Sequence, residues 1–288
     1  MNIQIAAATQ NLLGEGPLWD HRQKCLWWVD IKQSQLFRLR PAKQSYDSWE
    51  LPKAASVISL LRQETKLLLT CVGGFYEFDP ETGISESIGP FERHIESNRP
   101  NDGKCDPLGN LWVGSMDDAE EEKSGSLYRI SADLEPKPVL TGLGIPNTLA
   151  WSPDHKHFYF ADSTQQTIWK FDVNLETGTL SNQQVFASLK GTDIYPDGST
   201  IDQEGYLWNA QWNGWRVVRY APDGTIDKIL KMPVACPTSC MFGGENLSTL
   251  YVTSARKGQT DEELAQQPNA GSLFAISVNT TGLKETIF

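Results

Sequence analysis

Four segments of this chain can be aligned so that an acid or an amide falls at the same position in each. The residues at that position, called the anchor residues below, are Glu15, Asn101, Asn147 and Asp197, and each is followed by a turn and a second apolar run. In a protein built from repeats around an axis, residues at one repeat position converge on that axis. We therefore predict that these four oxygen-bearing side chains face a common point and form a metal site.

The donor atoms restrict the choice of metal. Glu15 and Asp197 bring two negative charges, whereas Asn101 and Asn147 bring neutral carbonyl oxygens. A site without His or Cys is hard and favours Ca²⁺, Mg²⁺ or Mn²⁺, although three oxygen ligands with vacant positions can also hold Zn²⁺ or Fe²⁺. The alternative is that these residues only cap strand ends or bind water. That alternative could explain a single polar residue, but it explains less well why a polar residue recurs at the same position of four repeats. The sequence therefore indicates one divalent cation, whose identity it does not specify.

Arg99 lies two residues before an anchor residue. It precedes Pro100, which favours an extended backbone at Arg99. A guanidinium group there is suited to hold substrate hydroxyls or a developing oxyanion. A salt bridge to Asp102 or Glu96 is the alternative, and the sequence favours neither.

Nucleophilic catalysis by a serine is not indicated. All four histidines fall in turns or connecting segments away from the predicted ligands, and no G-x-S-x-G motif is present. Trp212 and Trp215 follow a predicted strand in a loop that we expect near the metal site, where an aromatic face can pack on a sugar ring. Packing between repeats is nevertheless the more usual role of a tryptophan.

The spacing of the anchor residues predicts the elements that hold them. Successive anchors lie 86, 46 and 50 residues apart, so one weaker repeat is expected in the first gap, at 56–69, and another at 237–252. Six repeats of about 45 residues, each with four short strands separated by Asp, Pro and Gly turns, predict an all-β, six-bladed β-propeller of four-stranded antiparallel blades around a central metal-binding channel. Residues 1–288 would form this single domain, and residues 3–7 would complete the last blade. A β-helix or a sandwich does not explain why the polar positions keep phase.

The same arrangement predicts which loops surround the site. If each anchor residue begins an innermost strand, the loop after the second strand returns to the anchor's end of the channel. The loops so placed are 116–125, 162–165, 210–215 and 254–271. We expect them to shape the substrate pocket.

Composition excludes several classes of protein. A formal charge of −11, from 25 basic and 36 acidic residues, argues against nucleic-acid binding. No stretch approaches the roughly 20 apolar residues of a membrane span, and the first residues lack a secretory signal, so we expect a cytoplasmic protein. Five cysteines fit reduced thiols, and no long exposed apolar edge is evident, which favours a monomer or weak dimer.

At the anchor residues the chain resembles the gluconolactonase and regucalcin (senescence marker protein) family of six-bladed propeller lactonases. The matching segments are GEGPLW at 14–19, RPNDGKCDPLG at 99–109, GIPNTLAWSPD at 144–154 and YPDG at 195–198. The resemblance implies that Glu15, Asn147 and Asp197 bind one divalent cation, that Asn101 and Arg99 contact the sugar lactone, and that Asp197 is also the catalytic acid or base. The loop 116–125 does not align residue by residue with the family's substrate-contacting acid, so no role is transferred to an individual acid there.

The function predicted from these observations is metal-dependent opening of an aldonolactone, a pentono- or hexonolactone, to the aldonic acid. Asp197 would take a proton from the attacking water, or would only steer a water activated by the metal, since a carboxylate bound to a dication is a poor base. Two alternatives remain. One is a phosphotriesterase-like or aryl-ester hydrolase, and the other is a non-enzymatic calcium-binding regulator.

Overall fold

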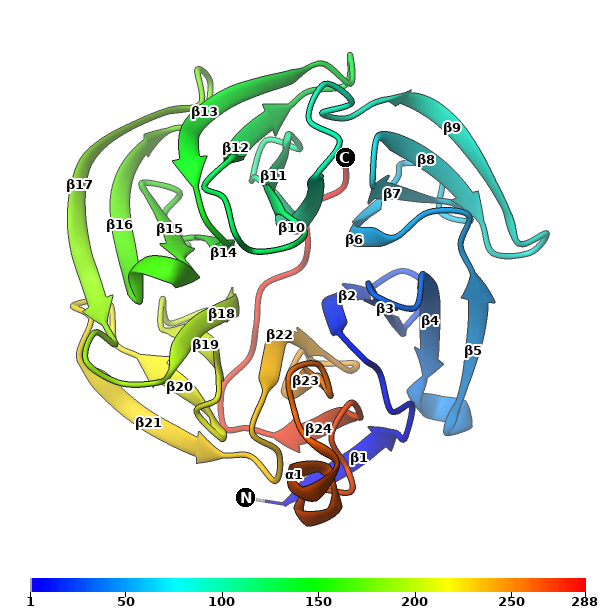
Figure 1. The fold of residues 1–288 in the computed structure, drawn as a ribbon, viewed down its shortest axis with the longest axis vertical. Helices are drawn as coiled ribbons and strands as arrows, with labels where there is room; N and C mark the ends of the chain where they lie inside the picture. The colour runs from blue at the N-terminus through cyan, green and yellow to red at the C-terminus, as the bar shows by residue number, and fades with distance from the viewer. Residues whose placement is uncertain (1) are drawn as a thin grey trace.

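The structure, a computed structural model, describes residues 2–288 and consists of six four-stranded antiparallel sheets arranged in a ring (Figure 1). The first three blades run from the innermost strand outward as β2 (Gly14–Asp20), β3 (Cys25–Asp30), β4 (Gln35–Arg40) and β5 (Ser45–Glu50); β6 (Ala55–Leu60), β7 (Leu67–Cys71), β8 (Gly74–Asp79) and β9 (Ile84–Pro90); and β10 (Asn98–Cys105), β11 (Leu111–Asp117), β12 (Gly125–Ile130) and β13 (Pro136–Leu143). The last three are β14 (Pro146–Trp151), β15 (His157–Asp162), β16 (Thr167–Asn174) and β17 (Thr179–Ser188); β18 (Tyr195–Ile201), β19 (Leu207–Trp212), β20 (Arg216–Tyr220) and β21 (Ile226–Lys231); and β22 (Pro237–Gly243), β23 (Thr249–Ser254), β24 (Leu273–Ser277) and β1 (Ile3–Ala7).

This architecture confirms the predicted six-bladed propeller, including both weaker repeats. The ring closes as expected, because β1 pairs with β24, with Ile3 opposite Ile276 and Ile5 opposite Phe274. The one α-helix of residues 2–288 is α1 (Asp261–Gln266), which begins with a capping box formed by Thr260 and Glu263. Two short 3₁₀ turns, η1 (Pro41–Lys43) and η2 (Ser163–Gln165), complete the elements.

The apolar core lies between neighbouring blades. The second strand of each blade is almost wholly buried, whereas outer strands such as β5 and β9 expose most of their residues. Trp112 packs edge to face against Trp151 of the next blade, at 5.8 Å between ring centroids, and Trp208 packs in the same way against Phe242. Most of the ten tryptophans therefore have a packing role, since six of them are buried: Trp19, Trp27, Trp28, Trp112, Trp151 and Trp208.

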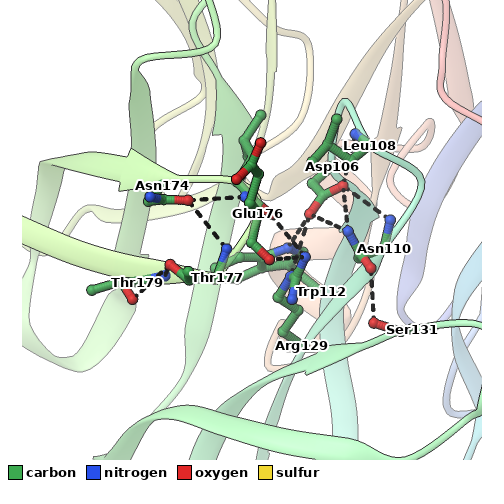
Figure 2. A network of polar contacts seen from close by, with 11 residues as sticks. Asp106, Leu108, Asn110, Trp112, Arg129, Ser131, Asn174, Glu176, Thr177 and Thr179 are labelled. Atoms are coloured by element: carbon green, nitrogen blue, oxygen red, sulfur yellow. Dashed lines mark hydrogen bonds and ion pairs between the residues drawn. The ribbon is translucent and has the colours of Figure 1, made fainter.

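Buried acids also organise the turns at the end of the ring remote from the anchor residues. In the turn at 106–110, Oδ1 of Asp106 accepts the backbone N–H groups of Leu108 and Asn110, and Oδ2 accepts the indole N–H of Trp112 at 2.9 Å (Figure 2). Arg129 donates from Nη2 to the carbonyl oxygen of Leu175 at 2.8 Å and so joins blade 3 to blade 4. Every acceptor of Asp106 is engaged within the fold, which marks it as a structural acid.

The final residues cross the ring (Figure 1). They lie at that same remote end, since residues 283–286 line a cavity together with Pro107 and Ser152 of the turns there. Gln203 donates its backbone N–H to the carbonyl oxygen of Thr281, and Phe288 donates its own to that of Leu60. Ile287 and Phe288 pack against two of the buried apolar clusters. No helix within residues 2–288 is long and apolar enough to cross a membrane.

Candidate metal centre and substrate pocket

A pocket of about 440 Å³ lies at the end of the ring where the innermost strands begin. All five residues predicted to form the site line it: Glu15, Arg99, Asn101, Asn147 and Asp197. The other lining residues are Leu13, Met116, Glu120, Ile145, Ser163, Thr164, Tyr195, Trp212, Lys257 and Gly258. Residues as far apart along the chain as Leu13 and Gly258 therefore meet here, and each of the four predicted loops contributes at least one residue.

The anchor residues reach the pocket from β-bulges in the innermost strands. In β2 and β14, Glu15 and Asn147 are the last residues paired with the second strand before the register shifts. In β10 and β18 the last paired residue is the proline before Asn101 or Asp197, so these two anchors lie one position further along, inside the bulge. The prediction that all four anchor residues occupy the same position of the repeat is therefore wrong by one residue. Asn101 and Asp197 lie one position further along their strands than Glu15 and Asn147 do. A bulge leaves residues unpaired and re-aims their side chains, which brings all four to one pocket.

Glu15 and Asp197 are buried carboxylates without a cationic partner among residues 2–288. Their exposed fractions are 9% and 7%, and each accepts one hydrogen bond from the backbone N–H of the glycine that follows it, at 3.0 and 3.1 Å. Burial, reinforced by the negative charge of Asp102, raises the pKa of Glu15 to about 8. Burial, followed by repulsion from Glu15, raises the pKa of Asp197 well above its ordinary value. Two such groups at one pocket require either protons or a bound cation.

Asn147 is oriented by partners on both sides. Its Nδ2 donates to Oγ of Ser163 at 2.9 Å, and its Oδ1 accepts from Nδ2 of Asn101 at 3.2 Å. The amide nitrogen of Asn101 also donates to the carbonyl oxygen of Pro146 at 2.9 Å. The amide oxygen of Asn147 therefore faces the neighbouring anchor residue Asn101, and its nitrogen faces Ser163.

Arg99 is held by three acceptors and is only 4% exposed. Its Nε donates to Oδ1 of Asp118 at 2.6 Å, and its Nη1 donates to Oδ1 of Asn101 at 2.8 Å and to the carbonyl oxygen of Pro100 at 3.0 Å. The salt-bridge partner is thus Asp118 rather than Asp102 or Glu96. Burial acts to raise the pKa of Asp118, but hydrogen bonds and charge from Lys32 and Arg99 outweigh it and lower that pKa. The guanidinium group lies at the pocket in a fixed orientation.

Three acidic residues of the loop 116–125 have different roles in the structure. Asp117 accepts the backbone N–H groups of Glu121 and Glu122 and so shapes the loop, while Asp118 holds Arg99. Glu120 lines the pocket and forms an ion pair there with Lys257 of the loop 254–271. Sequence reasoning selected both loops but neither Glu120 nor Lys257, because their pairing depends on loop conformations that no repeat dictates.

Only one of the two tryptophans predicted near the pocket contributes to it. Trp212 lines the pocket, whereas Trp215 is 44% exposed and is not among the lining residues.

All five cysteines are free and buried, as expected for reduced thiols. Burial raises the pKa of the Cys236 thiol to about 11, which makes it a poor nucleophile at neutral pH.

The residues present fit a hard divalent cation. Glu15 and Asp197 supply two carboxylates that form no ion pair with a side chain of residues 2–288, and Asn147 supplies a neutral oxygen whose amide nitrogen is engaged elsewhere. An oxygen-only set of this kind suits Ca²⁺, Mg²⁺ or Mn²⁺. A bound cation would relieve the repulsion between the carboxylates and favour their ionised forms.

Comparison with known proteins reveals similarity along almost the whole chain. A family model described as the SMP-30/Gluconolactonase/LRE-like region matches residues 13–256. The chain is 37% identical over 287 residues to L-arabinolactonase from Azospirillum brasilense, covering 99% of this chain and 94% of that protein. It is 33% identical over 287 residues to 6-deoxy-6-sulfogluconolactonase from Pseudomonas putida, covering 99% and 98%. Among solved structures, a calcium-binding protein, regucalcin, from Agrobacterium tumefaciens matches with a TM-score of 0.94 at 30% identity, over 99% of this chain and 96% of that one.

Proposed function

Because the chain belongs to the SMP-30/gluconolactonase/LRE-like family, whose members include sugar lactonases, we propose that it is a metal-dependent hydrolase that opens an aldonolactone to the aldonic acid. The observation that carries this proposal is the convergence of Glu15, Asn147, Asp197, Arg99 and Asn101 on one pocket. The pocket combines an oxygen-only metal set with hydrogen-bond donors and an aromatic wall, which suits a small polyhydroxylated ester.

Glu15, Asn147 and Asp197 would hold one divalent cation, either Ca²⁺, Mg²⁺, Mn²⁺, Zn²⁺ or Fe²⁺. When bound, such a cation acts as a Lewis acid that polarises the lactone carbonyl and stabilises negative charge on its oxygen. Asn101 lies next to this set through its hydrogen bond to Asn147, so it would contact the substrate rather than complete the metal shell.

The chain's own residues would orient the substrate and move the proton. Arg99 and Asn101 would bind hydroxyl and ester oxygens of the lactone, because both are fixed by hydrogen bonds to each other and to their surroundings. Water adds to the carbonyl carbon as the carboxylate of Asp197 accepts its proton. The ring C–O bond then breaks, and the departing ring oxygen takes up the proton held by Asp197 to become a hydroxyl group, while the carboxylic acid formed ionises. The products are the open-chain aldonate and one proton released at neutral pH.

The test is proton release from a panel of pentono- and hexonolactones, each with five- and six-membered rings, after spontaneous opening is subtracted. The protein is first stripped with EDTA and then given single divalent metals, and an aryl ester and a phosphotriester are measured in parallel. Acceleration of one or more lactones only after metal is restored supports the proposal. Faster turnover of the aryl ester or phosphotriester would favour that hydrolase instead. A protein that binds metal but accelerates none of these substrates would be a binding protein.

A further inference from the structure

Thr148, the residue after Asn147, has a backbone conformation that threonine seldom adopts. Its φ is +59°, in the left-handed region, and its side chain is fully buried. A β-branched residue is disfavoured there, and glycine is the usual occupant. Gly16, which follows Glu15 at the corresponding bulge of blade 1, has a φ of +57°. The bulge itself therefore does not require a side chain, and the threonine must be accounted for by what its side chain contacts.

The hydroxyl group of Thr148 reaches the backbone of another anchor residue. Its Oγ1 donates to the carbonyl oxygen of Asp197 at 2.6 Å, across the boundary between blade 4 and blade 5. Asn209 donates from Nδ2 to the same carbonyl oxygen at 2.9 Å, to Oγ of Ser199 at 3.0 Å and to Oγ1 of Thr148 at 3.2 Å. All of these groups are buried. They form a polar cluster directly behind Asp197.

The position of Asn209 is apolar in four of the other five blades. Asn209 pairs with the first residue after the bulge of its blade, and the residues with that pairing in blades 1, 3, 4 and 6 are Trp27, Val113, Tyr159 and Val252. In blade 2 the residue is Thr70, whose hydroxyl group has no hydrogen-bond partner. Burying polar groups is unfavourable unless their hydrogen bonds are made.

Buried hydroxyl groups also join neighbouring blades elsewhere in the ring, since Ser56 donates to the carbonyl oxygen of Pro100 and Thr238 to that of Gly14. What distinguishes Thr148 is its unfavourable φ combined with a bond to the main chain of Asp197, which points to a local task beyond the packing of blades.

We propose that Thr148 is a positioning residue for the metal site, whose hydroxyl group fixes the backbone of Asp197 relative to that of Asn147. This inference rests on the proposed function, which makes both of these residues metal ligands. Thr148 follows one proposed ligand directly and hydrogen-bonds the main chain of the other, so it couples their two strands. Ser163 provides a second link, since it accepts from Asn147 and donates to the carbonyl oxygen of Pro196 at 2.6 Å. Partners of this kind behind metal ligands typically change affinity by 10- to 100-fold when removed.

The test is the dissociation constant for Mn²⁺ or Ca²⁺, measured calorimetrically on the stripped full-length protein and three variants at this position. Thr148→Gly removes the hydroxyl group and the backbone strain, Thr148→Val removes the hydroxyl group and keeps the branching, and Thr148→Ser keeps the hydroxyl group. We expect affinity at least about tenfold weaker for Thr148→Gly and Thr148→Val, and within about threefold of the parent for Thr148→Ser.

Thr70→Val is the matched control, because Thr70 is fully buried in β7 of blade 2 and its hydroxyl group has no hydrogen-bond partner in the structure. Its metal affinity should equal that of the parent. Far-UV circular dichroism verifies folding, and if Thr148→Gly fails to fold, Thr148→Val carries the comparison. Parent-like affinity in the folded variants without the hydroxyl group, or equal weakening in Thr148→Ser, overturns the inference. A parent protein that binds no metal overturns the proposed metal site first, and this inference with it.

Discussion

Nδ2 of Asn101 lies 3.2 Å from Oδ1 of Asn147 and donates a hydrogen bond that joins blade 3 to blade 4 at the pocket. The bond belongs to a continuous series of contacts, in which Asp118 holds Arg99, Arg99 holds Asn101, and Asn147 is held in turn by Ser163. The series links the residues assigned to substrate binding with a residue assigned to the metal. A change at Asn101 should therefore affect both.

Replacement of Asn101 by alanine removes the donor to Asn147 and an acceptor of Arg99. We expect metal affinity to fall about tenfold and KM for the lactone to rise at saturating metal. Calorimetric metal titration and steady-state kinetics measure the two effects separately. Asn110→Ala, which alters the remote turn shown in Figure 2, is the control and should leave metal affinity unchanged. Unchanged metal affinity in Asn101→Ala would show that Asn147 is positioned without it.

Asp118→Asn should weaken substrate binding without changing metal affinity, because Asp118 contacts Arg99 and is not at the metal set. A hydrogen bond between charged groups is involved, but Asp118 is half exposed, so the expected loss in kcat/KM is moderate, about three- to tenfold. Lys32→Met removes the other partner of Asp118 while leaving Arg99 its carboxylate, and its effect should be smaller. Equal kinetics for Asp118→Asn and the parent would contradict a role of Asp118 in orienting Arg99.

The stripped protein should lose stability as pH rises, and added metal should restore it. The pKa of Glu15 is about 8 in the folded state against an ordinary value of 4.5. Between these values the unfolded chain binds fewer protons than the folded protein, so the free energy of unfolding decreases with increasing pH. Asp197 acts in the same direction. Thermal unfolding from pH 5 to 8.5, in EDTA and in excess divalent metal, should show a metal-induced increase in Tm that grows with pH.

Glu15→Gln is the informative variant in that experiment. It removes the group whose ionisation is unfavourable, so the fall in Tm with pH in EDTA should become shallower and the metal effect should largely disappear. A parent Tm in EDTA that is constant or rises across this range would contradict the assignment of an unrelieved carboxylate pair.

The C-terminal residues should contribute to stability rather than to the site. Ile287 and Phe288 pack on buried clusters at the end of the channel remote from the pocket. Truncating either to alanine should lower the free energy of unfolding by roughly 1–2 kcal/mol, as measured in urea, with metal affinity unaltered. Leu283→Ala is a matched control, since Leu283 is 37% exposed and should cost less. A change in metal affinity would show that this end of the channel communicates with the pocket.

Repetition made the fold and the convergence of the candidate site residues on one pocket predictable from the sequence. A propeller converts a recurrence along the chain into proximity in space, so the spacing of the anchor residues sufficed to predict six blades, the closing strand and the meeting of Glu15 with Asp197. The one-residue difference in register was not predictable, because it depends on where each bulge interrupts the pairing.

Features that break the repeat were accessible only in the structure. The partner of Arg99 is nineteen residues away in a loop rather than among the neighbouring acids, and the Glu120–Lys257 pair joins two loops of unrelated length. Thr148 was visible in the sequence as the residue after an anchor. Its left-handed conformation and its contact with the next blade emerge only once the bulges are placed.

The most direct test of the account is a titration of the stripped protein with the metal that best restores lactone opening, with activity and bound metal followed in the same samples. We predict that activity of the parent rises in proportion to metal until one equivalent per chain is bound and is then constant. Asp197→Asn, folded as the parent, should bind metal far more weakly and remain inactive over that range. Full activity of the stripped parent, or parent-like binding and turnover by Asp197→Asn, would contradict the claim that Glu15, Asn147 and Asp197 hold a catalytic cation.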